Sequence, residues 1–437
     1  MPALLSTLSD EDPDVRTAAA QALAKIPHPA AAEPLTVALE SAATSRMGKT
    51  ETGLAEYRAL AEAVAAQGQA AVQPLTSLLT SRHKDARLWA AWALGRIGSP
   101  AAVPGLAGAL EDRRSEVRRE AALALGLMAD RAALDPLLKA VVNRDPETRR
   151  AAAEALVGFP GEPSLKALEA ATRDGDETVQ RAAVASLAAM GTVTAALHLK
   201  SALDSDRKTT REEALAALNS PDLKPDGKDE RAALAVLRGD IDAALTEGGA
   251  AIPHLLEAMQ SRDAARRLPA ARALRRLKPA QAIPTFLHAL RDPEPQVREA
   301  VTEALIEIGT PVVDGLVLAA SSHDATVQHY AAIALGRIGD PSSAAALAGV
   351  IVRNRRTTEE YREPLDAARA AAYALHSILR QGAARVSDEG LDQICGVPDV
   401  MVEKPSLDDP HLVVAETGID CSPLRDLARQ ELSRRQS

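Results

Sequence analysis

The chain has 437 residues, of which 46% are hydrophobic and only 2% aromatic, and its formal net charge is −9. Its apolar runs are shorter than the roughly 18 residues of a membrane span, and the N-terminus lacks the basic start and long apolar stretch of a secretory signal. Two cysteines without a CxxC pairing favour a reducing compartment, so we expect a cytoplasmic protein with no membrane span.

The negative charge gathers near the C-terminus. Residues 387–420 hold nine acidic residues and one lysine, a net charge of −8, which leaves −1 for the rest of the chain. Because a nucleic-acid groove needs many cations to neutralise phosphates, the nearly neutral body argues against nucleic acid as a partner.

An internal repeat of 31 residues runs through the first half of the chain. One series is basic or polar and two are leucine: Arg87, Arg118, Arg149, Gln180, Arg211; Leu94, Leu125, Leu156, Leu187, Leu218; and Leu75, Leu106, Leu137, Leu168, Leu199. A fixed period of this length is typical of a solenoid, in which each unit packs mainly on its neighbours.

Each unit has the pattern of a helical hairpin. In the unit that starts at Asp112, one apolar stripe at helical spacing runs from Val117 to Met128, and a second, shorter stripe runs from Leu134 to Val141. Gly, Asp and Pro separate such helices, as in the segments 95–100 and 336–341. The predicted fold is therefore all-α, an α-α superhelix of about ten to eleven hairpins.

The units resemble a known family. Segments of the form D-x-x-V-R-x-x-A-A-x-A-L-G-x-I-G occur at 12–26, 85–98, 292–309 and 324–339. They are similar to HEAT repeats of the short type named after phycobilisome bilin lyases, and the resemblance covers roughly residues 1–380. It implies that an early Asp, such as Asp112 or Asp292, and the Val-Arg arginine form a ladder between adjacent units, so the recurring arginines have a structural role.

In chain order, breaks in the repeat predict four regions. An N-terminal array spans 1–218 and carries a polar insertion at 41–56; an irregular join follows at 219–250. A C-terminal array spans 251–380 with an insertion at 353–364, and an acidic tail spans 381–437. Insertions in repeat arrays fall on loops, where they either mark a binding side or reflect tolerated variation.

The tail has two interpretations. Its apolar residues between Leu391 and Ile419 are too numerous for a free linker, so we expect it to cap the open end of the last repeats. The alternative is an acidic arm that occupies the groove or a basic patch of a partner. The segment from Ser422 to Arg435 has the pattern of a short terminal helix, with Ser422 as its N-cap.

The candidate binding residues are departures from the repeat at surface positions. The resemblance implies that the Val-Arg helix lines the concave face, with exposed positions after the arginine, between the alanines and before the final Ile-Gly. These positions hold Leu88, Trp89, Trp92, Arg96, His329, Tyr330, Arg337 and Tyr373. Trp, Tyr and Arg dominate binding hot spots, and Arg beside Trp forms cation–π contacts. The alternative is that the tryptophans pack on a neighbouring unit or on the insertion 41–56.

The sequence predicts no catalytic, metal or cofactor site. The motifs of serine hydrolases, P-loop proteins and zinc proteases are absent, and His323, Asp324 and His329 lack a further strong ligand. Deoxyhypusine hydroxylases, which are HEAT-repeat enzymes, carry His-Glu pairs, and this chain contains no such dipeptide.

The expected function is therefore a non-enzymatic scaffold that binds a protein or peptide on its concave face. The alternatives are an accessory lyase or chaperone-like factor resembling bilin lyase subunits and, with less support, a HEAT-like DNA glycosylase. The Ala- and Arg-rich composition favours a bacterial source.

Overall fold

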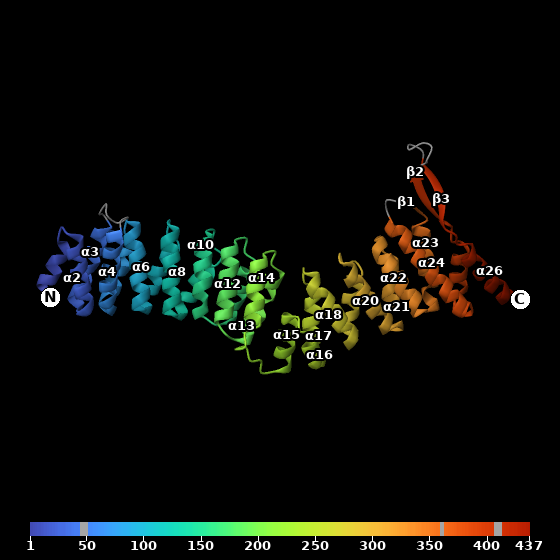
Figure 1. The fold of residues 1–437 in the computed structure, drawn as a ribbon, viewed down its shortest axis with the longest axis horizontal. Coiled ribbons are helices and arrows are strands. Elements are labelled where there is room, and N and C mark those ends of the chain that lie inside the picture. Colours follow the sequence, from blue (N-terminus) through green and yellow to red (C-terminus); the bar gives the residue numbers. More distant parts are fainter. Residues whose placement is uncertain (44–50, 359–361, 406–412) are drawn as a thin grey trace. The chain divides into compact units, whose positions relative to one another are not determined.

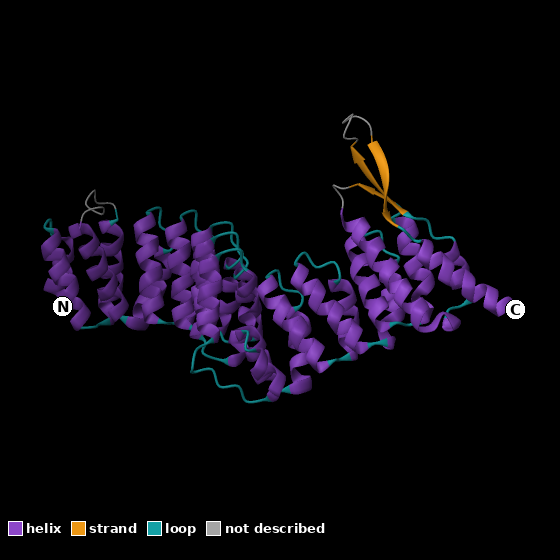
Figure 2. Ribbon diagram, turned by 45° about the vertical axis from the view of Figure 1, so that its right-hand side comes forward, coloured by secondary structure: helices purple, strands orange, loops and turns teal. Residues whose placement is uncertain are grey.

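The computed structural model describes residues 1–43, 51–358, 362–405 and 413–437. They form two compact units, Met1–Pro225 and Asp226–Ser437. The boundary between the units lies within the segment 219–250, where the repeat spacing is interrupted. The predicted all-α superhelix is confirmed, and helices account for most of each unit (Figures 1 and 2).

In the first unit, long and short helices alternate along the chain and form two layers (Figure 1). After the short α1 (Pro2–Ser6), the long layer contains α2 (Pro13–Lys25), α4 (Glu51–Ala66), α6 (Lys84–Ile97), α8 (Ser115–Met128), α10 (Pro146–Ala155), α12 (Glu177–Ala189) and α14 (Lys208–Leu218). The other layer contains α3 (Ala32–Ala42), α5 (Val72–Leu78), α7 (Val103–Ala109), α9 (Leu134–Ala140), α11 (Glu162–Ala171), α13 (Val193–Leu197) and the 3-10 helix η8 (His198–Asp204).

Local signals set the ends of the long helices. The side chain of Asp145 accepts a hydrogen bond from the backbone N–H of Thr148 at 3.0 Å, which caps the start of α10. Helix α6 ends at Ile97 and is followed by Gly98, whose φ of 67° is left-handed and suits glycine.

The leucines of the repeat form the core between the two layers. Leu94, Leu125, Leu187 and Leu218 from the long helices, and Leu156 from the 3-10 turn directly after α10, are at most 1% exposed, and Leu75, Leu106, Leu137, Leu168 and Leu199 are fully buried. Burying one such side chain contributes about 1.5–3 kcal/mol, so these repeated positions dominate the cohesion of the stack.

A buried ladder of guanidinium groups joins successive repeats, as the family resemblance implied. Arg87 donates to both carboxylate oxygens of Asp112 in the next repeat, at 2.6 and 2.9 Å, and also to the carbonyl of Ser81 in its own repeat. Arg149 and Asp174 repeat this bidentate contact at 2.7 and 2.8 Å. Each arginine therefore binds a backbone carbonyl near the start of its own helix and the aspartate of the next repeat at the same time, which links the two repeats.

The ladder continues with other side chains where the arginine is replaced. The Gln180 amide donates to the carbonyl of Asp174, and its oxygen accepts from the hydroxyls of Ser205 and Thr210, each at 3.0 Å. In the second unit the bidentate pair is Arg267 with Asp292, at 2.7 and 2.8 Å.

Small residues allow the long helices to approach closely. A Cβ built on Gly95 lies 2.8 Å from the Cα of Ala124 on the next long helix, and one built on Gly336 lies 2.6 Å from the Cβ of Ala374. Both distances are too short for a real Cβ contact, so glycine is required at these crossings.

The second unit, taken by itself, also consists of two layers of helices. It contains α15 (Lys228–Arg238), α16 (Ile241–Thr246), α17 (Ala251–Ala258), α18 (Ala264–Leu277), α19 (Ile283–Ala289), α20 (Pro295–Ile308), α21 (Val313–Ala320), α22 (Ala325–Ile338), α23 (Ala344–Arg353), α24 (Arg362–Gly382), α25 (Asp388–Cys395) and α26 (Ser422–Gln436). Helices α15 and α16 lie within the segment that we expected to be irregular, and residues 232–236 of α15 are buried. Their short length and polar start gave no helical periodicity long enough to recognise.

A small sheet, which the sequence did not predict, stands beside α23 and α24 (Figures 1 and 2). Strand β1 (Arg356–Thr358) pairs in parallel with β2 (Val400–Pro405), and β2 pairs antiparallel with β3 (Val413–Ile419). The sheet thus joins the insertion 353–364 to the tail. Local periodicity cannot reveal it, because β1 and β2 lie more than 40 residues apart in the sequence.

The described part of the tail covers the last repeat. Leu391, Ile394, Leu424 and Ala428 are at most 3% exposed and belong to the same apolar cluster as α24. The burial of these residues therefore agrees with the interpretation that the tail caps the last repeat. Helix α26 ends one residue beyond the predicted segment, but the prediction of Ser422 as its N-cap is wrong: Ser422 is the first helical residue, and Cys421 precedes it as an N-cap without a side-chain hydrogen bond.

We predict that the Asp112→Asn variant unfolds more easily than the wild type. The side chains of Arg87 and Asp112 are only 5% and 10% exposed, and removing one charge of a buried pair leaves the other uncompensated, at a cost of about 3 kcal/mol. Urea unfolding of the full chain measures the difference. Glu162→Gln is the control, because its ion pair with Lys166 is exposed and its loss costs about 0.5 kcal/mol. Equal destabilisation by both variants would contradict a structural role for the ladder.

The difference between the wild type and Asp112→Asn is also expected to depend on pH. Burial alone raises the pKa of Asp112, but hydrogen bonds from Arg87 and from the backbone N–H of Arg114 outweigh it and lower the pKa. A carboxylate with a lowered folded-state pKa stabilises the fold above its unfolded pKa of about 4 and loses this contribution as the pH falls through the folded pKa. The two proteins should therefore become more alike in unfolding measurements below about pH 4.

Candidate functional site

The first candidate site is an aromatic cluster on α4 and α6 of the first unit. The rings of Tyr57 and Trp89 stack with centroids 6.2 Å apart and an angle of 10° between their planes. Trp92, one turn along α6, meets Trp89 edge to face at 5.6 Å and 70°. The Arg96 guanidinium lies 5.0 Å from the Trp92 centroid, a cation–π contact.

Tyr57 forms the buried side of this cluster. Its side chain is 2% exposed, and its hydroxyl has no hydrogen-bond partner among the described residues. Burial, reinforced by the negative charges of Asp85 and Glu56, raises the pKa of Tyr57 to about 12. Next to it, Glu56 accepts two hydrogen bonds from Arg16 on α2, at 2.5 and 3.0 Å, and these tie α4 to the preceding repeat.

The sequence left two interpretations of the tryptophans, contact with a partner or packing on a neighbouring unit, and the structure shows features of both. Leu88, Trp89 and Trp92 are half-buried, whereas Arg96 is exposed. Trp89 packs on the neighbouring helix through Tyr57, yet part of each indole still faces solvent. The structure therefore brings the four predicted residues together on one face of α6.

The second candidate site is a groove of about 420 Å³ between α22 and α24 in the second unit. Its floor is apolar because Gly336 allows Ala374 to approach closely, and Ile333 and Ala370 extend it. Tyr373 stands on the rim and is 74% exposed. A pocket of this size suits one large side chain or a short peptide segment.

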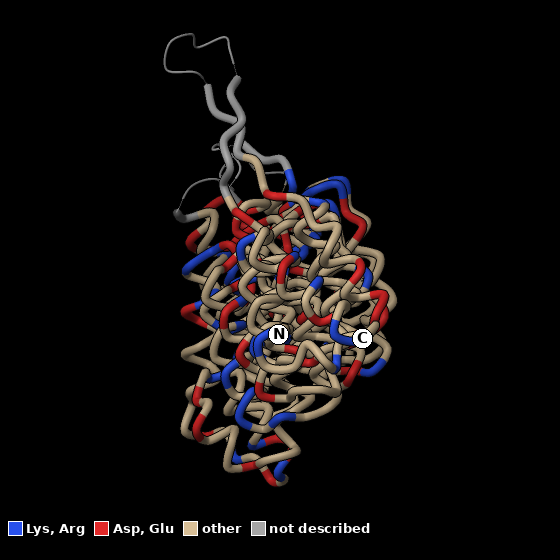
Figure 3. Tube along the Cα trace, turned by 90° about the vertical axis from the view of Figure 1, so that its right-hand side faces the viewer, with Lys and Arg blue, Asp and Glu red and all other residues tan. Residues whose placement is uncertain are grey.

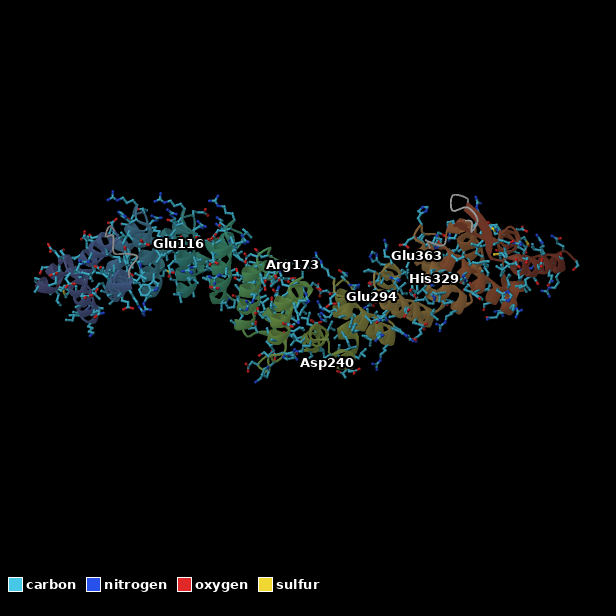
Figure 4. The ribbon with its side chains drawn as sticks, turned by 45° about the horizontal axis from the view of Figure 1, so that its top comes forward. Glu116, Arg173, Asp240, Glu294, His329 and Glu363 are labelled. Carbon is cyan, nitrogen blue, oxygen red and sulfur yellow. The ribbon has the colours of Figure 1, made fainter. Side chains whose placement is uncertain are left out.

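The predicted residues His329 and Tyr330 point to different neighbours. His329, labelled on α22 in Figure 4, lines the groove, and its Nδ1 is buried without a hydrogen-bond partner among the described residues. Tyr330 meets the imidazole edge to face at 5.0 Å and lies under the Arg298 guanidinium, 5.3 Å from its centroid. Tyr330 thus packs toward α20, while His329, Arg337 and Tyr373 share the groove.

The charges around the groove are already balanced. Arg337 forms an ion pair with Glu303 of α20, and Arg369 lies 3.4 Å from Asp366 on α24. Across the chain, basic and acidic residues are interspersed along the trace (Figure 3). This mixed pattern does not provide the continuous cationic surface that nucleic acid prefers.

Two parts of these sites were missed at the level of sequence. Tyr57 stands 31 positions before Leu88, so the repeat spacing places it at the position equivalent to Leu88. Asp366 and Arg369 follow the insertion 353–364, which shifts the spacing, and no sequence signal placed them beside α22.

Other chemical features of the described residues are limited. In these ranges, no three His, Cys, Asp or Glu side chains gather as a metal site requires, and His323, Asp324 and His329 form no such group. Likewise, no described helix is both long enough and apolar enough to cross a membrane. Cys395 and Cys421 are free thiols.

Comparison with known families finds matches over most of the chain. The profile of HEAT repeats matches residues 1–49, 55–126, 106–176, 134–219 and 252–317, and that of the PBS lyase HEAT-like repeat matches residues 327–350. No curated protein matches the chain.

Among solved structures, three illustrate the likeness. Kap95p, in a structure with RanGDP, is 14% identical, with 99% of this chain covered, 60% of that chain and a TM-score of 0.38. An engineered protein is 21% identical over 100% and 98% of the two chains, with a TM-score of 0.29. Human deoxyhypusine hydroxylase is 21% identical over 61% and 95%, with a TM-score of 0.27. The chain thus spans 60% of the length of the Kap95p chain.

We predict that Tyr57 controls the alkaline stability of the aromatic cluster. A tyrosine whose folded-state pKa is raised to about 12 stabilises the fold fully below its unfolded pKa of about 10 and progressively less as the pH rises toward 12. Tyrosinate absorbance should therefore show one late step near pH 12, which Tyr57→Phe removes. At pH 7 the variant should differ in unfolding free energy by less than about 1 kcal/mol, because no partner of the hydroxyl is lost. Persistence of the late step in Tyr57→Phe would assign it to another tyrosine.

Proposed function

Because the chain belongs to the HEAT-repeat family, we propose that it is a non-enzymatic, cytoplasmic scaffold that binds a protein or peptide partner along the exposed positions of its long helices. The observation that carries this proposal is Tyr373. A large aromatic side chain that is 74% exposed beside an apolar groove is typical of a residue in a protein-binding surface.

The separation between structural and surface positions supports a binding role. The recurring arginines and leucines are occupied by contacts between repeats. The aromatic residues on α6, α22 and α24 lie outside this ladder and core, and Trp89, Trp92 and Tyr373 keep part or most of their surface exposed to solvent. The chain therefore keeps its fold while its surface residues select a partner.

A protein partner fits the groove better than a nucleic acid does. The floor is apolar, and the flanking Arg337 and Arg369 already have carboxylate partners. A polypeptide segment can insert an apolar side chain between α22 and α24 while its polar groups meet this balanced rim. The aromatic cluster around Trp89 and Trp92 offers a second contact surface, in the other unit.

We predict that Tyr373→Ala weakens binding of peptides selected from a random phage-displayed library on the full-length protein. Loss of a hot-spot aromatic costs about 2 kcal/mol or more, which is roughly a 30-fold weaker affinity. Binding is measured with purified synthetic peptides by calorimetry.

The matched control is Leu318→Ala on α21 of the same unit. Leu318 is 76% exposed, so this change also removes a large exposed apolar side chain, but Leu318 does not line the groove. If the selected peptides bind both variants as they bind the wild type, the groove is not the docking site.

A further inference from the structure

Consecutive long helices meet through side chains that lie 32 residues apart. Tyr57 and Trp89 form such a pair, with stacked rings. Arg181 and Glu213 form another, with a hydrogen bond of 2.7 Å. In each pair the first residue directly follows a repeat position equivalent to Arg87, which is Glu56 or Gln180. The second residue lies two positions after the equivalent residue of the next repeat, which is Arg87 or Arg211.

The same two positions hold Leu88 and Glu120 where α6 meets α8. The register is fixed on this helix pair by Lys84 and Glu116, also 32 residues apart, whose Nζ and Oε1 lie 3.3 Å apart. Glu116 is labelled near the start of α8 in Figure 4, and Glu120 follows one turn later. Leu88 therefore has the same position relative to Glu120 as Arg181 has relative to Glu213, but leucine carries no charge to pair with the carboxylate.

Glu120 has no ion-pair partner among the described residues. Its side chain is half-buried, and within the described residues it takes part in no ion pair or hydrogen bond. Burial raises its pKa, and Arg119, its neighbour in sequence, is the one charge that opposes this effect among the described residues. A carboxylate that is poorly solvated and poorly paired gains more from an incoming cation than a fully hydrated one does.

The aromatic cluster lies on the helix that faces this carboxylate. Trp89 directly follows Leu88 on α6, and Trp92 lies one turn further along the same helix. Both indoles are partly exposed, and the Arg96 guanidinium lies 5.0 Å from the centroid of Trp92, so the Trp92 ring accepts a cation. A carboxylate and aromatic rings on adjacent helices together favour a guanidinium or ammonium group over an acidic or neutral one.

We propose that the surface formed by Leu88, Trp89, Trp92 and Glu120 binds a Lys or Arg side chain of a protein partner. This inference rests on the proposed scaffold function and names the chemistry of the partner for the first unit. The partner supplies to Glu120 the cation that Arg181 supplies to Glu213 within the chain. Its aliphatic stem packs on Leu88, and its charged end lies between the carboxylate and the indoles.

Tryptophan fluorescence of the full-length protein provides a local measurement, because Trp89 and Trp92 are the two tryptophans of the chain. The probes are two synthetic peptides of alternating Gly and Arg or Gly and citrulline, which have nearly the same shape but differ in charge. We expect a saturable fluorescence change with the arginine peptide and at least tenfold weaker binding of the citrulline peptide. Equal binding of the two peptides would overturn the proposal.

Two variants test the role of Glu120 in opposite ways. Glu120→Gln removes the charge, and Leu88→Arg places an internal cation at the position that Arg181 occupies relative to Glu213; each should weaken arginine-peptide binding at least tenfold. Glu213→Gln is the matched control and should bind as the wild type does, because Glu213 already has an internal partner. Circular dichroism verifies that each variant is folded, and Leu88→Arg is expected to raise the unfolding temperature.

The outcomes separate this inference from the scaffold proposal. If Glu120→Gln and Leu88→Arg both bind the arginine peptide as the wild type does, the cation site is refuted, even where library peptides still depend on Tyr373. If charge discrimination fails and library peptides are also insensitive to Tyr373→Ala, the proposed docking function fails with it.

Discussion

The bidentate contact between a buried arginine and the aspartate of the next repeat is the constraint on which the rest of the structure depends. Arg87 with Asp112, and Arg267 with Asp292, bind the guanidinium to a carboxylate across the repeat boundary and to a carbonyl at the start of the arginine's own helix. The planar fork of arginine satisfies both sets of acceptors at once, which lysine cannot do. Each contact therefore sets the distance and the register between neighbouring helical hairpins, and the leucine core follows from that register.

A fixed register has a consequence for the surface. Side chains that lie 32 residues apart meet between adjacent long helices, as the Tyr57–Trp89 stack and the Arg181–Glu213 ion pair demonstrate. The scaffold thus supplies a row of equivalent contact positions. Where the two side chains complement each other in charge or shape, they pair within the chain. Where they do not, as at Leu88 and Glu120, the carboxylate has no ion-pair partner among the described residues and is proposed to bind a cation of a partner.

The end of the array illustrates how a solenoid with an open core is completed. Residues of α25 and α26 cover the apolar face of the last repeat, and Arg435 near the C-terminus donates to the carbonyls of Ala383 and Val386. The sheet joins the same region through β1, which lies in the insertion, and β2, which lies in the tail. Terminal units need such a cover, because a repeat stacked on one side only leaves half of its apolar surface exposed.

The sequence by itself determined the repeating helical hairpin and the buried leucines, because each depends on a short spacing that recurs and is read along one helix. The arginine ladder was implied by the resemblance to HEAT repeats. The sequence also placed Trp89, Trp92 and Arg96 on one face of α6. Only the tertiary structure decided that Tyr373 and His329 share a groove while Tyr330 turns toward α20, that Tyr57 completes the aromatic cluster, and that the tail pairs with the insertion. These are contacts between separate helices and strands, and their partners are set by packing and by insertions that interrupt the period, neither of which local spacing encodes.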